Sequence, residues 1–142
     1  MGQPEYKLGY EGVGRMETAV PPRDYPEWRT GQFDRPEDAA YLFGYYLVMH
    51  CRDEAMATLP ADAPPDVKAA VEKAVDIALH NVCDMMEGFW RLNAGPEHTI
   101  SLALGVQVRD ARNEVIETQE ISPCKLDLPI GYWKWARERE FR

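Results

Sequence analysis

Two histidines and two aspartates are the residues of this chain whose types and spacing best fit a chemical site: His50, Asp76, His80 and Asp84. The last three follow one another at i, i+4 spacing, so in a helix their side chains share a face. If two antiparallel helices meet in a turn near residues 62 and 63, His50 lies level with Asp76. Helical bundles bind Zn, Fe or Mn with such imidazole and carboxylate groups. The spacing predicts a divalent metal site and, with it, a metal-dependent hydrolase.

In a competing interpretation, these residues bind no metal ion. Asp76, His80 and Asp84 occupy the centre of the polar face of the second predicted helix, where solvated side chains belong. The chain has no HExxH or ExxH signature. A carboxylate-only alternative combines Asp53 and Glu54 with Asp84 and Glu87, a ligand type that Mg²⁺ accepts. The estimated register does not bring Asp53 level with Asp84. The alternative to a metal site is therefore a helix face that is solvated or that contacts a partner.

Aromatic residues form a second group of candidates, of which four are singled out as binding residues: Trp28, Tyr45, Trp90 and Trp133. Trp28 lies in an otherwise polar, loop-like segment, which makes a purely structural role least expected there. Such side chains line small-ligand pockets and form the centres of protein interfaces. Most buried aromatic residues nevertheless belong to the core. An aromatic ligand pocket, a partner-binding surface and core packing all remain open.

Charge and cysteine content narrow the classes of partner and compartment. The 142-residue chain has 24 acidic and 16 basic residues, a net charge of −8, which argues against binding the phosphates of nucleic acids or anionic membranes. Its three cysteines form no CxxC pair, as in proteins of a reducing compartment. The N-terminus has no apolar run typical of a signal peptide, and the apolar stretch over 39–49 is too short to span a bilayer. We expect a cytoplasmic protein with no membrane association.

Two long helices are predicted to position the candidate residues. The first begins near Pro36, with Asp34 as its cap, and stops at Pro60. Its apolar residues point in all directions, so burial on every side is expected. The second runs from about Asp66 to Leu92 and has a clean amphipathic pattern. Its apolar side is Val67, Val71, Val75, Ala78, Val82, Met86 and Phe89.

The periodicity changes to two after residue 96. Residues 100–108 and 115–121 alternate apolar and polar side chains around a turn at 110–113, which predicts a β-hairpin. A short C-terminal helix over 130–140, rich in aromatic residues, is expected to pack on this sheet. The fold class is α+β, a long antiparallel helical hairpin followed by an antiparallel β-hairpin and that C-terminal helix. We expect one domain over 1–142, with an extended arm over 1–33, the helical hairpin over 34–95 and the remainder over 96–142.

The predicted helices carry more apolar surface than one β-hairpin can cover. This surplus predicts a homodimer in which helical hairpins form a four-helix arrangement. No strong catalytic motif accompanies it, so the leading hypothesis is a non-enzymatic interaction or accessory protein with a further, unidentified protein partner and no obligatory cofactor. The metal-dependent hydrolase and the small-ligand binder are its alternatives.

Overall fold

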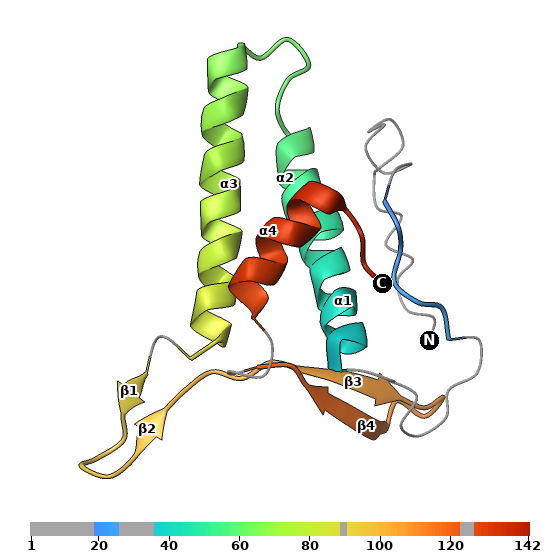
Figure 1. Ribbon diagram of the computed structural model, residues 1–142, viewed down its shortest axis with the longest axis vertical. Coiled ribbons are helices and arrows are strands. Elements are labelled where there is room, and N and C mark those ends of the chain that lie inside the picture. Colours follow the sequence, from blue (N-terminus) through green and yellow to red (C-terminus); the bar gives the residue numbers. More distant parts are fainter. Residues whose placement is uncertain (1–18, 26–35, 89–90, 123–126) are drawn as a thin grey trace.

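The computed structural model describes residues 19–25, 36–88, 91–122 and 127–142. Four helical segments come from the first two thirds of the chain: α1 (Pro36–Tyr46), the π-helix η2 (Leu47–Asp53), α2 (Glu54–Ala57) and α3 (Pro65–Met86). Two short hairpins and a last helix follow: β1 (Leu92–Asn93) with β2 (Thr99–Ile100), β3 (Gly105–Arg109) with β4 (Val115–Glu120), and α4 (Leu128–Glu138). The predicted α+β architecture is confirmed (Figure 1).

The helical hairpin has the two predicted arms. α1, η2 and α2 follow one another without a break from Pro36 to Ala57, and α3 begins with Pro65 in its first turn, where the missing N–H has no helical partner. α3 ends at Met86, six residues before the predicted end at Leu92, because Gly88 adopts a left-handed φ of 80° that ends helices. The predicted cap at Asp34 lies outside the described residues.

The first arm is not buried on every side, contrary to the expectation. Leu47, Val48 and Met49 are buried, whereas Tyr46 is 61% exposed and His50 is exposed. The arm contacts α3, α4 and the β3–β4 hairpin, and these neighbours leave part of its circumference open. None of the described helices is both long and apolar enough to cross a membrane.

The predicted strand over 100–108 is divided between two hairpins. Ile100 pairs with Leu92, while Gly105–Arg109 pairs antiparallel with Val115–Glu120, as predicted for the return strand. The turn at 110–113 forms because the carboxylate of Asp110 accepts hydrogen bonds from the backbone N–H groups of Arg112 and Glu114. Asn113 adopts the left-handed conformation that asparagine tolerates.

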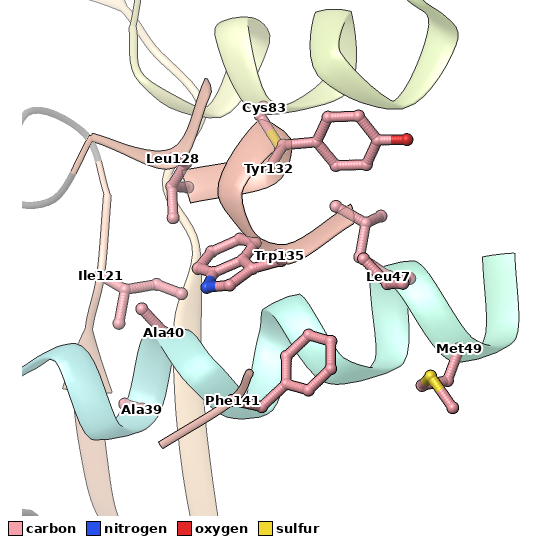
Figure 2. Packing of buried hydrophobic residues seen from close by; sticks show 11 residues of the cluster. Ala39, Ala40, Leu47, Met49, Cys83, Ile121, Leu128, Tyr132, Trp135 and Phe141 are labelled. Carbon is pink, nitrogen blue, oxygen red and sulfur yellow. The ribbon is translucent and has the colours of Figure 1, made fainter. Parts of the chain in front are cut away.

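The core lies where α4 meets α1, η2 and α3 (Figure 2). Tyr132 and Trp135 of α4 are 0% and 5% exposed, and the indole of Trp135 packs so closely on α1 that a Cβ atom at Gly44 would overlap it. The remaining buried apolar residues are Ala39, Ala40, Leu47, Val48, Met49, Cys83, Ile121, Leu128 and Phe141. α4 was expected to pack on the sheet; it packs on the helices, which offer Trp135 a glycine-lined groove.

The described part of the N-terminal segment lies beside the C-terminal tail. The N–H of Val20 donates to the carbonyl of Arg139 at 2.9 Å, and the N–H of Phe141 donates to the carbonyl of Val20 at 3.0 Å. Residues 19–25 therefore pack on their own chain at this point.

Candidate functional site

The side of α3 that faces the rest of the molecule carries acidic residues beside the apolar residues Leu79, Cys83 and Met86, which pack in the core. Glu72 and Asp76 contact Arg52 of η2, and Asp76 also contacts Tyr132 of α4. Further along the helix, buried Glu87 accepts a 3.1 Å hydrogen bond from the backbone N–H of Leu128. The amphipathic pattern had placed Asp76 on a solvated face; its side chain is 14% exposed. This orientation arises because the buried cation of η2 needs acidic partners, since an unpaired buried charge is costly.

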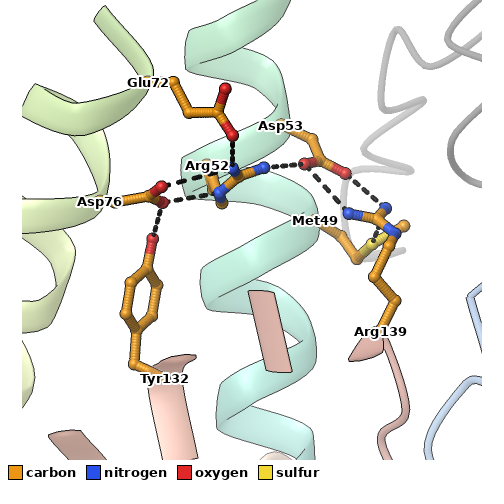
Figure 3. A network of polar contacts seen from close by, with 7 residues as sticks. All are labelled: Met49, Arg52, Asp53, Glu72, Asp76, Tyr132 and Arg139. Carbon is orange, nitrogen blue, oxygen red and sulfur yellow. Dashed lines mark hydrogen bonds and ion pairs between the residues drawn. The ribbon is translucent and has the colours of Figure 1, made fainter. Parts of the chain in front are cut away.

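Arg52 is the centre of a polar network that joins three helical segments (Figure 3). Its Nε donates to Oδ1 of Asp76 at 2.7 Å, and its Nη2 donates to Glu72 at 2.9 Å. Its Nη1 lies 3.4 Å from the carboxylate of Asp53, and the hydroxyl of Tyr132 donates to Asp76 at 2.5 Å. Only 5% of Arg52 is exposed. Such charge-assisted bonds are roughly twice as strong as neutral ones.

Asp53, the next residue in η2, pairs with a second arginine. Nη2 of Arg139, at the end of α4, donates to Oδ2 of Asp53 at 2.6 Å, and the Asp53 side chain is 2% exposed. Adjacent helical residues point in different directions, so Arg52 reaches α3 while Asp53 reaches the end of α4. Arg139 adopts φ 55° and ψ 36°, a left-handed conformation usual for glycine at this place in a helix. The ion pair holds a strained backbone in place.

Tyr132 and Arg52 both keep their protons near neutral pH, as expected of groups with a structural role. Burial and the hydrogen bond to Asp76 raise the pKa of Tyr132 above its usual range, so its phenol stays protonated and is not a base near neutral pH. Burial tends to lower the pKa of Arg52, but the hydrogen bond to Asp76 and its charge outweigh that effect and raise it. Arg52 therefore remains a cation, with Glu72, Asp76 and Asp53 as its counter-charges.

The four predicted metal-binding residues do not converge. His50 lies on an exposed surface with its Nδ1 3.0 Å from Glu54, and Asp76 is engaged by Arg52 and Tyr132. His80 contacts Asp84 at 3.6 Å. Within the described residues, no three His, Cys, Asp or Glu side chains are grouped in a way that could hold a metal ion. The geometry gives the metal hypothesis no support, because a cation, Arg52, stands where His50 was expected to face Asp76.

The carboxylates of the proposed Mg²⁺ alternative are also engaged separately. Asp53 is neutralised by Arg139, and Glu87 caps the start of α4, so neither carboxylate joins Glu54 or Asp84.

The structure describes two of the four aromatic candidates, Tyr45 and Trp133. Trp28 and Trp90 lie outside the described residues. Tyr45 is half-buried and meets Phe141 edge to face at a centroid distance of 5.3 Å, a core contact. Trp133 is half-buried, with the imidazole of His80 5.3 Å from its ring and the guanidinium of Arg137 over it at 5.8 Å.

Two hollows flank the network. One, of about 530 Å³, lies between α3 and α4 and is lined by Arg52, Glu72, Asp76, Trp133, Ala136, Arg137 and Arg139. The other, of about 240 Å³, lies beside the loop that joins the two arms of the helical hairpin and is lined by Asp53, Met56, Ala57, Leu59, Pro60, Ala61, Lys68 and Glu72. Both are partly open to solvent. Charged residues line most of the first, and the second adds five uncharged residues to Asp53, Lys68 and Glu72. Neither is the enclosed apolar pocket typical of small-ligand sites.

The described thiols are poor nucleophiles. Cys83 is fully buried, and burial raises its pKa to about 12. Cys51 is an exposed residue whose pKa is raised, first by burial of the sulfur and then by the negative charge of Glu54. A thiolate is the reactive form, so both groups are mostly protonated near neutral pH.

An uncharged side of α3 faces away from the other helices. Val67 and Ile77 are 41% and 44% exposed, and Ala70, Ala74 and Ala78 are exposed as well. Val71, Val82 and Met85 are half-buried on the same side, and Asn81 is its one polar member. We call these nine residues the outer face of α3. Figure 1 shows α3 at the margin of the molecule, with α1, α2 and α4 all to one side of it.

The β1–β2 hairpin, which follows α3, is a second exposed apolar feature. Leu92, Ile100 and Leu102 are 70%, 52% and 46% exposed. An isolated two-stranded hairpin is marginal in water. A surface that covered these side chains would stabilise it.

Sequence reasoning missed Arg52, Tyr132 and Arg139 as members of the polar network. The estimated register had a signal for Arg52, because it placed this residue within one turn of both Glu72 and Asp76. A lone cation near the end of an otherwise apolar helix should have been read as a buried charge that needs partners. Nothing local indicated Arg139, whose partner is 86 residues away.

No protein-family model, curated protein or solved structure matches this chain. Its function has to be inferred from its own surface and chemistry.

Proposed function

We propose that this chain is a non-enzymatic interaction protein of the cytoplasm that binds another protein through the outer face of α3. One observation carries the proposal: the 22-residue helix α3 leaves a nine-residue uncharged face turned away from the other helices. A helix normally buries its apolar stripe. The outer face therefore gains most from contact with a second protein surface.

The length and character of the outer face fit an interface. Twenty-two residues at 1.5 Å each extend about 33 Å, and the nine residues of the face include no charge. Charged residues are depleted at the centres of interfaces, while apolar ones are enriched. The inward network supports this use, because it anchors α3 to η2 and α4 by charged hydrogen bonds and keeps the orientation of the helix rigid.

A photo-crosslinking amino acid placed on the surface tests the proposal. Benzoylphenylalanine replaces Ala74, at the middle of the outer face, and in a control it replaces Ile130, which is 66% exposed on α4. Irradiation of cells that express each variant should yield a protein adduct from position 74 and little from position 130. Equal yields, or no adduct from position 74, would contradict the proposed interface.

A further inference from the structure

We infer that the protein bound by the outer face of α3 is a second copy of this chain, packed antiparallel across a two-fold axis near Ile77 and Ala78. This inference rests on the proposed function and names its partner. It is argued from the uncharged surface of the face, from charge on its borders and from the hairpin that continues it.

The outer face is uncharged along its whole length, so two copies can pack on each other. In an antiparallel pair, residue numbers that face each other have a constant sum. With the axis between Ile77 and Ala78, that sum is about 155. On one border of the face Ile77 then lies beside Ile77 of the other copy, and on the opposite border Val71 lies beside Val82. Apolar side chains meet along both borders, which allows close helix packing.

The charged residues beside the outer face favour the same antiparallel arrangement. Lys73 and Asp84 lie on one border, because their positions on the α3 helical wheel differ by about 20°. Lys73 is exposed, and Asp84 makes a long contact with His80, at 3.6 Å. In an antiparallel pair each border meets the same border of the other chain. Lys73 of each chain then lies within about one turn of Asp84 of the other chain. This pairing would form two intermolecular ion pairs.

A parallel pair would not satisfy these charges. There the border with Lys73 would meet the opposite border, whose charged residue is Lys68. Two lysines would approach each other, at a cost in free energy. Sliding the antiparallel pair to a sum of 150 would place Asp66 against Asp84, again a like-charge contact. Charge therefore favours the antiparallel register near 155 over the one near 150.

The neutrality of the outer face also fits self-association. Two copies of a chain with a net charge of −8 repel each other, so their contact has to be made where charge is absent. The β1–β2 hairpin follows the C-terminal end of α3 and carries exposed Leu92 and Ile100, so it adds apolar area beside the helix seam. A single helix seam is small compared with the roughly 800 Å² per partner of a standard interface. We expect a dissociation constant in the micromolar range.

Light scattering and sedimentation of the full chain over a range of concentrations test the inference. The wild type should approach twice the chain mass of 16.2 kDa as concentration rises. Ile77→Glu and Ala74→Glu should each weaken the dimer more than tenfold, and Ile130→Glu, a matched change on α4, should leave it intact. Unchanged thermal unfolding of each monomer would show that the variants fold. A wild type that stays monomeric near 100 µM, or a dimer indifferent to both α3 variants, would overturn the inference.

A charge exchange tests the orientation. Lys73→Glu and Asp84→Lys should each weaken dimerisation by roughly fivefold, and the double variant should restore it to within about twofold. Additive loss in the double variant would overturn the antiparallel register.

Failure of this inference is distinguishable from failure of the proposed function. If the crosslinked product at position 74 is a different protein, the outer face is an interface but not a self-interface. If position 74 yields no adduct, the proposed function itself fails.

Discussion

The hydroxyl of Tyr132 on α4 donates a 2.5 Å hydrogen bond to the carboxylate of Asp76 on α3, the same carboxylate that Arg52 of η2 binds. One side chain of α3 thus connects the helical hairpin to the C-terminal helix. The contact also fixes which side of α3 faces inward, and with it the side that is exposed. The polar network and the proposed interface are two consequences of one helix orientation.

Removing the phenolic hydroxyl should destabilise the fold without disturbing its packing. Tyr132 is fully buried, and Tyr132→Phe takes one hydrogen bond from the half-buried Asp76. We expect the free energy of unfolding in urea to fall by about 1–3 kcal/mol, the cost of an unsatisfied bond to a charged group. Tyr46→Phe, at a residue that is 61% exposed, is the control and should change the free energy by less than about 0.5 kcal/mol. Equal effects of the two changes would contradict the role of the bond.

Two substitutions of Arg139 separate its ion pair from its backbone strain. Both Arg139→Ala and Arg139→Gly leave the buried carboxylate of Asp53 without its 2.6 Å partner, so both should lower stability by roughly 3 kcal/mol or more. Glycine adopts φ 55° without the steric cost that alanine bears. Arg139→Gly should therefore be the more stable of the two by about 1 kcal/mol. Chemical denaturation measures the difference, and an Arg139→Ala variant as stable as Arg139→Gly would show that no strain is present.

The close approach of α1 and α4 predicts that Gly44 tolerates no side chain. A Cβ atom there would overlap the indole of Trp135, which is 5% exposed and held within the core. Gly44→Ala should lower the free energy of unfolding by about 1–3 kcal/mol, the usual cost of overpacking, although alanine favours helices. Differential scanning calorimetry should show the loss as a lower Tm. A higher Tm for Gly44→Ala would mean that the two helices lie further apart.

Stability should decline at alkaline pH through the buried thiol of Cys83. Burial raises its pKa from 9.0 to about 12 in the folded chain. The folded state holds the thiol proton more tightly than the unfolded state does. The contribution of Cys83 to stability is therefore complete below pH 9 and is lost as the pH rises from 9 towards 12. The slope is up to about 1.4 kcal/mol per pH unit.

Urea denaturation at several values between pH 8.5 and 10 measures this slope. Cys83→Ala should reduce it, whereas Cys51→Ala, at an exposed residue, should retain most of it. Tyr132, whose pKa is also raised, adds to the decline only above about pH 10. An unchanged slope in Cys83→Ala would place the titration elsewhere.

Local pattern determined the secondary structure of this protein. Helix periodicity, the prolines near 36 and 60, and the two-residue alternation around Asp110–Asn113 predicted the helical hairpin, the β3–β4 hairpin and the C-terminal helix, because these signals act between residues close in sequence. The tertiary structure decided which side of α3 faces inward. Periodicity distinguishes two sides of a helix but not their directions. In this fold the charge of Arg52 and the hydroxyl of Tyr132, 24 and 56 residues from Asp76 in sequence, turn Asp76 towards the interior beside the core-facing Cys83. The uncharged outer face is left to solvent.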